Sequence, residues 1–115
     1  DISFFHDMTS LLIANHYKIN MTIIIINNNG GQIFNMLPYK EEIDEKYDRF
    51  WTTPISIEIK QACKLYQLDY YAIKSINDIE NSLNTILDIK GVNIVEIKTD
   101  FDTTKDTQEK INQRF

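Results

Sequence analysis

The sequence predicts an α/β fold in which a small parallel sheet is covered by helices on both faces. Two observations lead to this prediction. Short apolar stretches rich in β-branched or aromatic residues, at 21–27, 68–73 and 92–97, indicate strands. Segments with apolar residues at helical spacing lie between them. Helices and strands therefore alternate along the chain, an order that favours parallel strands joined by helical crossovers.

Length and composition limit the class of protein. The chain has 115 residues, which is enough for one modest domain, so 1–115 is taken as a single domain. The net charge of −5 argues against nonspecific binding to nucleic acid or to anionic membranes. No apolar run approaches the roughly 20 residues of a membrane span. The single cysteine, Cys63, excludes an internal disulfide and fits a reducing, cytoplasmic compartment.

The first predicted element is a helix, and the second is a strand. The apolar residues of the helix share one face: Phe4, Met8, Leu11 and Leu12. Ser3 is its predicted N-cap, and the helix is expected to fade near 15–18. The strand at 21–27 contains the unbroken apolar run Ile23–Ile26, which is typical of a strand covered on both faces.

The middle of the chain is more polar. Asparagines and glycines at 27–31 predict a turn at the carboxyl end of the first strand. A short helical segment, 32–36, follows and is stopped by Pro38. The charged stretch 40–49 predicts a surface helix, with a lid that orders on binding as the alternative. A loop with two large aromatic side chains is expected at 50–54.

Two further helices and a last one complete the pattern. The first has a short apolar face: Ile59, Ala62, Cys63 and Tyr66. The second begins with the capping pattern Ser75–Asp78 and ends before Gly91. Its predicted stripe is Ile76, Ile79, Leu83 and Ile86. The last helix is expected near 104–115, with Ile111 and Phe115 directed inward.

Candidate chemistry lies in the pairing of Asp1 with the turn at 27–31. One helix and one strand separate Asp1 from Asn28, a connection that can bring the ends of two neighbouring parallel strands together. A carboxylate, an amide oxygen and backbone carbonyls are hard ligands that suit Mg²⁺. One carboxylate suits a ligand that brings its own negative oxygens, such as a diphosphate. The spacing alone leaves open that 27–31 is only a turn, because Asn and Gly are common turn formers.

Asp-x-Ser at the start, followed by Asn-Asn-Gly at this spacing, resembles the diphosphate-binding motif of thiamine-diphosphate enzymes, Gly-Asp-Gly, a spacer and Asn-Asn. The glycine before Asp1 lies outside the chain, and Ile2 stands where the second glycine would be. DISFFHDM together with IIIINNNGGQIFNMLP is similar to the menaquinone-pathway 2-succinyl-5-enolpyruvyl-6-hydroxy-3-cyclohexene-1-carboxylate synthase family (MenD). The similarity is strongest over 1–38 and continues more weakly through LYQLDYYAI and NIVEIKTD. It covers only the final part of such an enzyme, its C-terminal pyrophosphate-binding domain.

The resemblance implies roles for individual residues. The implied ligands of Mg²⁺ (or Mn²⁺) are Asp1, Asn28 and Gly30. The implied contacts to thiamine diphosphate are Ile2, Ser3, Gly31, Gln32 and Ile33. The implied apolar wall beside the thiazolium and the substrate is Ile33, Phe34 and Leu37, for which ordinary core packing is the alternative. It implies no catalytic residue within this fragment, because the activating glutamate belongs to another domain, usually of another subunit.

The resemblance also implies a reaction. The family decarboxylates 2-oxoglutarate and adds the resulting succinic semialdehyde unit to isochorismate in menaquinone (vitamin K2) biosynthesis. The complete enzyme would be a C–C bond-forming transferase and a homodimer or homotetramer, and the fragment alone is expected to be inactive. One alternative is another thiamine-diphosphate enzyme, of the acetolactate synthase or 2-oxo acid decarboxylase type. The other is a non-catalytic α/β binding domain.

The first residue, Asp1, is not a methionine, and we expect the chain to be a piece of a longer protein with a further strand before Asp1. An edge left open there is expected to favour self-association. Cys63 is expected to be a buried structural thiol rather than a nucleophile. His6 and His16 have no acidic partner at ligand spacing and are expected at the surface.

Overall fold

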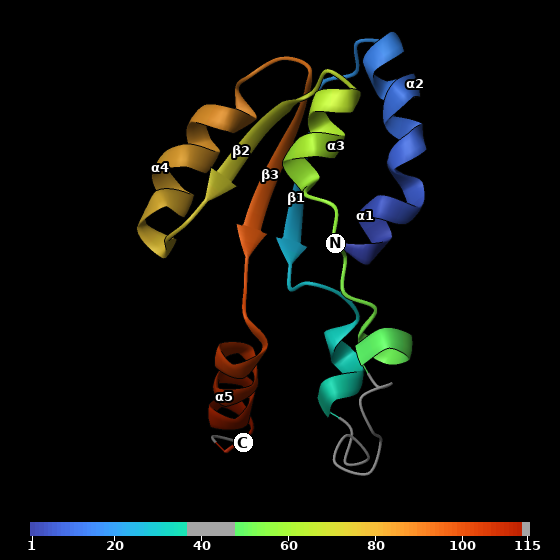
Figure 1. Cartoon of the computed structure of the whole chain (residues 1–115). Helices are drawn as coiled ribbons and strands as arrows, with labels where there is room; N and C mark the ends of the chain where they lie inside the picture. Colours follow the sequence, from blue (N-terminus) through green and yellow to red (C-terminus); the bar gives the residue numbers. More distant parts are fainter. Residues whose placement is uncertain (37–47, 114–115) are drawn as a thin grey trace.

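Three parallel strands form the centre of the chain (Figure 1). A computed structural model describes residues 1–36 and 48–113. The strands are β1 (Met21–Asn27), β2 (Asp69–Ile73) and β3 (Val92–Lys98), in the order β1-β3-β2. Both neighbours of β3 run parallel to it, with Ile23 and Tyr70 placed opposite Ile94 from either side. The predicted α/β class with a small parallel sheet is confirmed.

Helices cover both faces of this sheet. The helical elements are, in chain order, α1 (Ile2–Asp7), η1 (Met8–Ser10), α2 (Leu11–His16), η2 (Gln32–Met36), η4 (Asp48–Thr52), α3 (Ile59–Leu65), α4 (Ile76–Leu87) and α5 (Phe101–Asn112). The helices α1, α2 and α3 lie on one face, and α4 lies on the other (Figure 1). The elements η2, η4 and α5 lie beyond the carboxyl ends of the strands (Figure 1). These helical elements therefore gather beyond the carboxyl end of the sheet.

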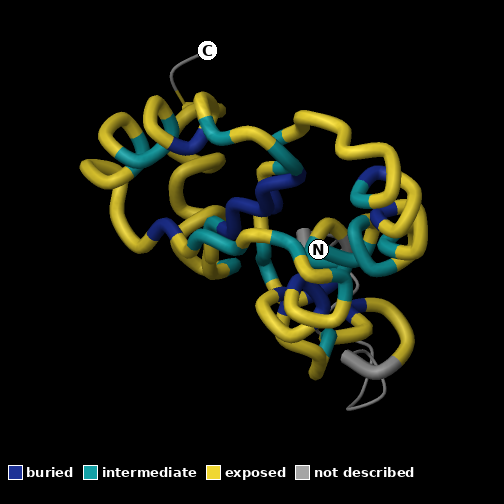
Figure 2. Tube along the Cα trace, turned by 90° about the horizontal axis from the view of Figure 1, so that it is seen from above, coloured by how far each residue is buried: buried dark blue, intermediate teal, exposed yellow. Residues whose placement is uncertain are grey.

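The core consists of one apolar layer on each side of β3. Alternate residues of a strand point to opposite faces, and Ile94 and Val95 are both 0% exposed. The layer under α2 and α3 contains Leu11, Ala14, Ile25, Ile59, Cys63, Val92 and Ile94. The layer under α4 contains Ile73, Ile86 and Val95. Figure 2 shows these buried residues in dark blue, surrounded by chain that is mostly exposed.

The strand β1 differs from the prediction of burial on both faces. Ile23 and Ile25 pack in the layer under α2 and α3. Ile24 and Ile26 point the other way and are 47% and 52% exposed. The reason is that α4 packs over β2 and β3 and does not reach β1, which is an edge strand.

Several helix predictions are confirmed. The Ser75 hydroxyl accepts a hydrogen bond from the Asp78 backbone N–H and caps α4. Gly91 adopts a left-handed φ of 104° in the turn that precedes β3. Ile59, Ala62 and Cys63 form the buried face of α3 as expected.

The first helix departs from the prediction in two ways. Asp1, rather than Ser3, is its N-cap, because the Asp1 carboxylate accepts the backbone N–H of Ile2. Leu12 is 59% exposed instead of buried. The 3₁₀ turn η1 separates α1 from α2, and its tighter winding shifts the phase of the apolar face, so that Leu12 turns outward.

Other departures have similar local causes. Ile76 is the first residue of α4 and is 82% exposed, so the stripe begins at Ile79. The last helix begins at Phe101, and Ile111 is 45% exposed because α5 buries no residue against the sheet. The segment predicted as a loop at 50–54 overlaps the end of the helical element η4, so its first three residues are helical.

Some predictions fall on residues that the structure does not describe. The charged helix at 40–49 lies almost wholly outside the described residues, as do Leu37 and Phe115. Within residues 1–36 and 48–113, none of the helices combines the length and apolar character that a bilayer crossing requires.

Candidate functional site

The Asn–Gly loop, residues 27–31, follows β1 at the carboxyl end of the sheet. Asn27 is the last residue of the strand, and its side-chain Oδ1 accepts the backbone N–H of Asn29 at 3.0 Å. Such a bond shapes a tight turn. Asn29 and Gly30 then both adopt a left-handed backbone, with φ of 62° and 119°. Asn tolerates this region and Gly enters it without strain, so these residue types fit the turn they form.

Asp1 contacts this loop directly. Its Oδ2 accepts the backbone N–H of Gly30 at 2.8 Å, although the two residues are 29 positions apart. Its Oδ1 accepts the N–H of Ile2 at 2.7 Å. The Asp1 backbone nitrogen also donates to the carbonyl of Ile26, near the end of β1. The predicted proximity of Asp1 to the loop is confirmed, and one carboxylate both caps α1 and holds the loop.

The two glycines of the loop approach the backbone of η4. The N–H of Gly31 donates to the carbonyl oxygen of Thr52 at 2.7 Å. A Cβ on Gly30 would clash with that same oxygen, and a Cβ on Gly31 would lie 3.0 Å from the carbonyl oxygen of Trp51. Glycine is therefore required at position 30 both for its backbone angle and for space.

The element η2 continues from the loop. The N–H of Gln32 donates to the carbonyl of Gly30 at 3.0 Å, and the Gln32 side chain donates to the carbonyl of Asn29 at 3.4 Å. Ile33 is 71% exposed on this element. The side chain of Phe34 and the whole of Leu37 lie outside the description, so only Ile33 of the predicted apolar wall is placed.

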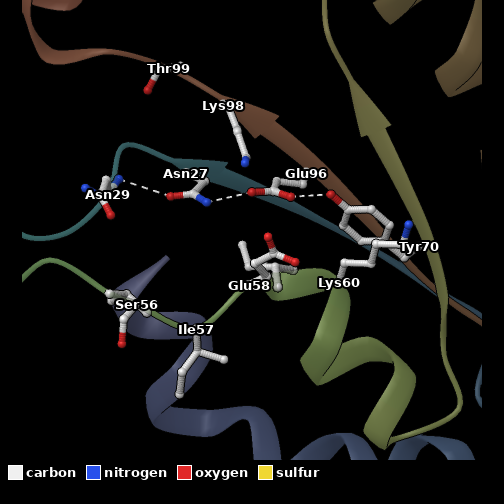
Figure 3. A pocket seen from close by; sticks show the side chains of 12 residues that line it. Asn27, Asn29, Ser56, Ile57, Glu58, Lys60, Tyr70, Glu96, Lys98 and Thr99 are labelled. Carbon is white, nitrogen blue, oxygen red and sulfur yellow. Dashed lines mark hydrogen bonds between the residues drawn. The ribbon is translucent and has the colours of Figure 1, made fainter.

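A buried carboxylate, Glu96, lies next to the loop and was missed by sequence reasoning. Glu96 is 3% exposed. Its Oε1 accepts a hydrogen bond of 2.6 Å from Nδ2 of Asn27, and its Oε2 accepts one from the hydroxyl of Tyr70 (Figure 3). Burial raises the pKa of Tyr70 above its usual range, and the hydrogen bond to Glu96 adds to this shift. The available signal was an acidic residue in the strand VNIVEI, where all other residues except Asn93 are apolar.

A pocket of about 490 Å³ opens beside this carboxylate (Figure 3). Its charged and hydrogen-bonding lining includes Asn27, Asn29, Lys60, Tyr70, Glu96 and Lys98. Asp1 lines a different hollow of about 360 Å³, which follows the edge of β1 and includes Ser3. The pocket beside Glu96 is therefore lined in part by the Asn–Gly loop, whereas the hollow beside Asp1 is lined by residues of the first helices and of β1.

The donor set around the loop fits a Mg²⁺–diphosphate ligand. Each Asp1 oxygen accepts one N–H, and a carboxylate oxygen has a further lone pair for a cation. Asn28 offers an amide oxygen in the same loop. Gly30 has no space for a side chain, so it can contribute only its backbone groups. Among the described residues no group of three or more His, Cys, Asp or Glu side chains could hold a metal ion. Any cation here would need oxygens from its ligand, as a diphosphate provides.

Outside the loop, the plainer expectations are confirmed. Cys63 is 1% exposed. Burial raises the pKa of its thiol from 9.0 to about 11, which makes it a poor nucleophile at neutral pH. His6 and His16 are both exposed.

Comparison with known proteins gives a consistent result over most of the chain. It is 38% identical over 99 residues to the 2-succinyl-5-enolpyruvyl-6-hydroxy-3-cyclohexene-1-carboxylate synthase of Listeria monocytogenes serotype 4b. It is also 38% identical over 100 residues to the synthase of the same name from Oceanobacillus iheyensis. The Staphylococcus aureus (strain JH9) synthase is 38% identical over 82 residues. The chain is homologous to one segment of these synthases.

The match is long in this chain and short in the synthases. It covers 86% of this chain but 17% of the Listeria synthase, and 71% of this chain but 15% of the Staphylococcus synthase. The chain thus spans about a sixth of the length of the synthases that it matches. No family model matches the sequence.

Proposed function

We propose that this chain is the diphosphate-binding segment of a thiamine-diphosphate- and Mg²⁺-dependent synthase of menaquinone biosynthesis. One observation carries the proposal: Asp1 Oδ2 accepts the Gly30 N–H at 2.8 Å. This bond joins the two halves of the motif that sequence alone could only place near each other. Homology to one segment of the synthases supports the same assignment.

The proposed ligands of Mg²⁺ are the Asp1 carboxylate, the Asn28 amide oxygen and the Gly30 carbonyl. The proposed contacts to the cofactor are Ile2, Ser3, Gly31, Gln32 and Ile33. The exposed Ile33 would form an apolar wall with Phe34 and Leu37. Bound thiamine diphosphate would supply the electron sink for decarboxylation of a 2-oxo acid. The part of this chain is to hold the diphosphate end and fix its position.

The complete protein is proposed to decarboxylate 2-oxoglutarate and to join the resulting unit to isochorismate. In this proposal it is a cytoplasmic homodimer or homotetramer, and the other domain supplies the groups that activate the cofactor. The 115 residues alone would then be inactive. Turnover of 2-oxoglutarate with isochorismate by the isolated chain would contradict this last point.

The decisive experiment measures thiamine-diphosphate binding by the full-length protein while Mg²⁺ is titrated. Asp1→Ala and Asn28→Ala should each weaken the apparent Mg²⁺ affinity by about tenfold or more, because each removes an oxygen ligand. Matched controls are Asp88→Ala and Asn84→Ala, which remove the same groups from exposed positions on or next to α4. Both controls should keep wild-type affinity.

Normal Mg²⁺-dependent binding in both site variants would overturn the metal assignment. Substrate profiling of the full-length protein tests the reaction separately. Activity with pyruvate alone, without any use of isochorismate, would instead favour an enzyme of the acetolactate synthase or decarboxylase type. Absence of cofactor binding by the wild-type protein would favour a non-catalytic domain.

A further inference from the structure

Four groups form a continuous chain of hydrogen bonds across the carboxyl end of the sheet, which we call the Glu96 network. The Tyr70 hydroxyl donates to Glu96, and Asn27 Nδ2 donates to the other Glu96 oxygen at 2.6 Å. Asn27 Oδ1 then accepts the backbone N–H of Asn29 at 3.0 Å. The network starts on β2, crosses β3 and ends inside the Asn–Gly loop (Figure 3).

Stability alone does not account for a carboxylate at this place. Glu96 is the one ionisable side chain among the buried polar residues that the structure describes, Thr52, Asn93 and Glu96. The next inward residues of the same strand, Ile94 and Val95, are fully buried and apolar. Burial of a carboxylate is costly even when it is hydrogen-bonded, and an apolar residue would fill the position more cheaply. Its position at the edge of a pocket and its bond to Asn27 point to a role in the loop that it reaches.

The chemistry of the network fixes the direction of the Asn27 amide. An ionised carboxylate only accepts hydrogen bonds, and a backbone N–H only donates. Asn27 must therefore turn its Nδ2 toward Glu96 and its Oδ1 toward Asn29. A flipped amide would lose both bonds, since it would face acceptor with acceptor and donor with donor.

The backbone of Asn27 is held independently of its side chain. Its carbonyl accepts the N–H of Thr99 at 2.9 Å, and the residue pairs with Lys98 in the sheet. With the backbone fixed by the sheet and the amide fixed by Glu96, Asn29 is held in its left-handed conformation. Asn29 leads directly into Gly30, whose N–H meets Asp1.

We propose that Glu96 is a positioning residue, which orients Asn27 and thereby sets the conformation of the Asn–Gly loop against Asp1. It touches neither cofactor nor metal; it acts through Asn27. The consequence for Mg²⁺ and diphosphate binding rests on the proposed function. The consequence for the loop itself does not.

An exchange of groups tests this in the full-length protein. Asn27→Asp places a second carboxylate opposite Glu96, so the bond between them is lost. Asn27→Asp combined with Glu96→Gln restores every bond, since the glutamine Nε2 can donate to the new carboxylate at position 27 while its Oε1 accepts from Tyr70. Hydrogen exchange of peptides covering residues 27–36 should be about tenfold faster in Asn27→Asp and return to near the wild-type rate in the double variant.

Glu58→Gln is the matched control, because Glu58 is an exposed carboxylate on the wall of the same pocket. It should leave exchange of the loop unchanged. Peptides from α4 report in the same data whether each variant is folded. If Asn27→Asp fails to fold, Tyr70→Phe removes the opposite end of the network without adding charge and should also speed loop exchange.

The outcomes separate the two proposals. Loop exchange that is unchanged in Asn27→Asp, or that stays fast in the double variant, overturns the positioning role. Where Tyr70→Phe is the deciding variant, an unchanged exchange rate overturns it. Titration of Mg²⁺ with thiamine diphosphate in the same samples should show weaker binding in Asn27→Asp and recovery in the double variant. Recovery of exchange without any cofactor binding by the wild-type protein would support the network and overturn the proposed function.

Discussion

At the amino end of the sheet, Asn20 and Gly91 join the turns that precede β1 and β3, whereas at the carboxyl end Asn27 and Gly30 are held by carboxylates. Asn20 Oδ1 accepts the N–H of Gly91 at 2.8 Å, and the Gly91 carbonyl accepts the N–H of Met21. These contacts close the ladder between two adjacent strands and involve only amides. The same residue types at the carboxyl end are connected to Glu96 and Asp1, and Asn27 also lines the pocket beside Glu96.

The surroundings of the two glycines show the same difference. Both have a left-handed φ, 104° at Gly91 and 119° at Gly30. A Cβ added to Gly91 meets nothing within 4 Å, whereas at Gly30 it clashes with the carbonyl of Thr52. A turn glycine needs only its backbone angle, but Gly30 also needs the space. The difference indicates that the carboxyl-end loop is packed into a fixed shape and that the amino-end turn is only a connection.

The largest expected effect comes from an alanine at each glycine. Gly30→Ala combines strain with a backbone clash and should lower the free energy of unfolding by about 3 kcal/mol. Gly91→Ala should lower it by about 1 kcal/mol, through backbone strain alone. Urea unfolding of the chain measures both.

A second measurement checks whether the glycine effect reaches the site. Full-length Gly30→Ala should lose Mg²⁺-dependent binding of thiamine diphosphate, and Gly91→Ala should retain it. An equal loss of cofactor binding in both variants would contradict the proposed difference between the two ends of the sheet.

The next largest expected effect is a loss of stability at alkaline pH. Two groups with raised pKa values cause it: Cys63 under α3 and Tyr70 in the Glu96 network. The pKa of Cys63 is raised from 9.0 to about 11, chiefly by burial. Between these values the unfolded chain releases the thiol proton while the folded chain keeps it. The folded state then binds more protons, so stability falls as pH rises from 9 to 11, by about 2–3 kcal/mol from this group. The raised pKa of Tyr70 acts in the same direction at higher pH.

Unfolding free energies at about pH 8 and about pH 11 test this. Cys63→Ala should reduce the fall between the two values, even though the cavity that it creates lowers stability at both. Asn20→Ala at the amino end should leave the fall unchanged. A fall of the same size in Cys63→Ala would show that the thiol is not its source.

The sequence was sufficient to predict that Asp1 lies close to the Asn–Gly loop, but not which side chains hold that loop in place. A helix and a strand between Asp1 and Asn28 determine that both reach the carboxyl edge of the sheet, and Asp1 does contact the loop. Glu96 could not be predicted as a partner, because its bond to Asn27 joins residues 69 positions apart across a long crossover. The exposure of Leu12 was hidden for a different reason. The 3₁₀ turn η1 rotates the apolar face of the following helix, and no residue type in the sequence predicts a 3₁₀ turn at this place.

The smallest expected effect comes from alanine at the two asparagines. Asn27→Ala removes one of the donors to the buried Glu96 carboxylate and should lower the free energy of unfolding by about 2 kcal/mol. Asn20→Ala removes an exposed hydrogen bond whose partner can bind water and should cost about 0.5–1 kcal/mol. Urea unfolding of both variants at about pH 7 gives the difference. A larger cost for Asn20→Ala than for Asn27→Ala would mean that the amino-end turn, and not the Glu96 network, is the better-fixed end of the sheet.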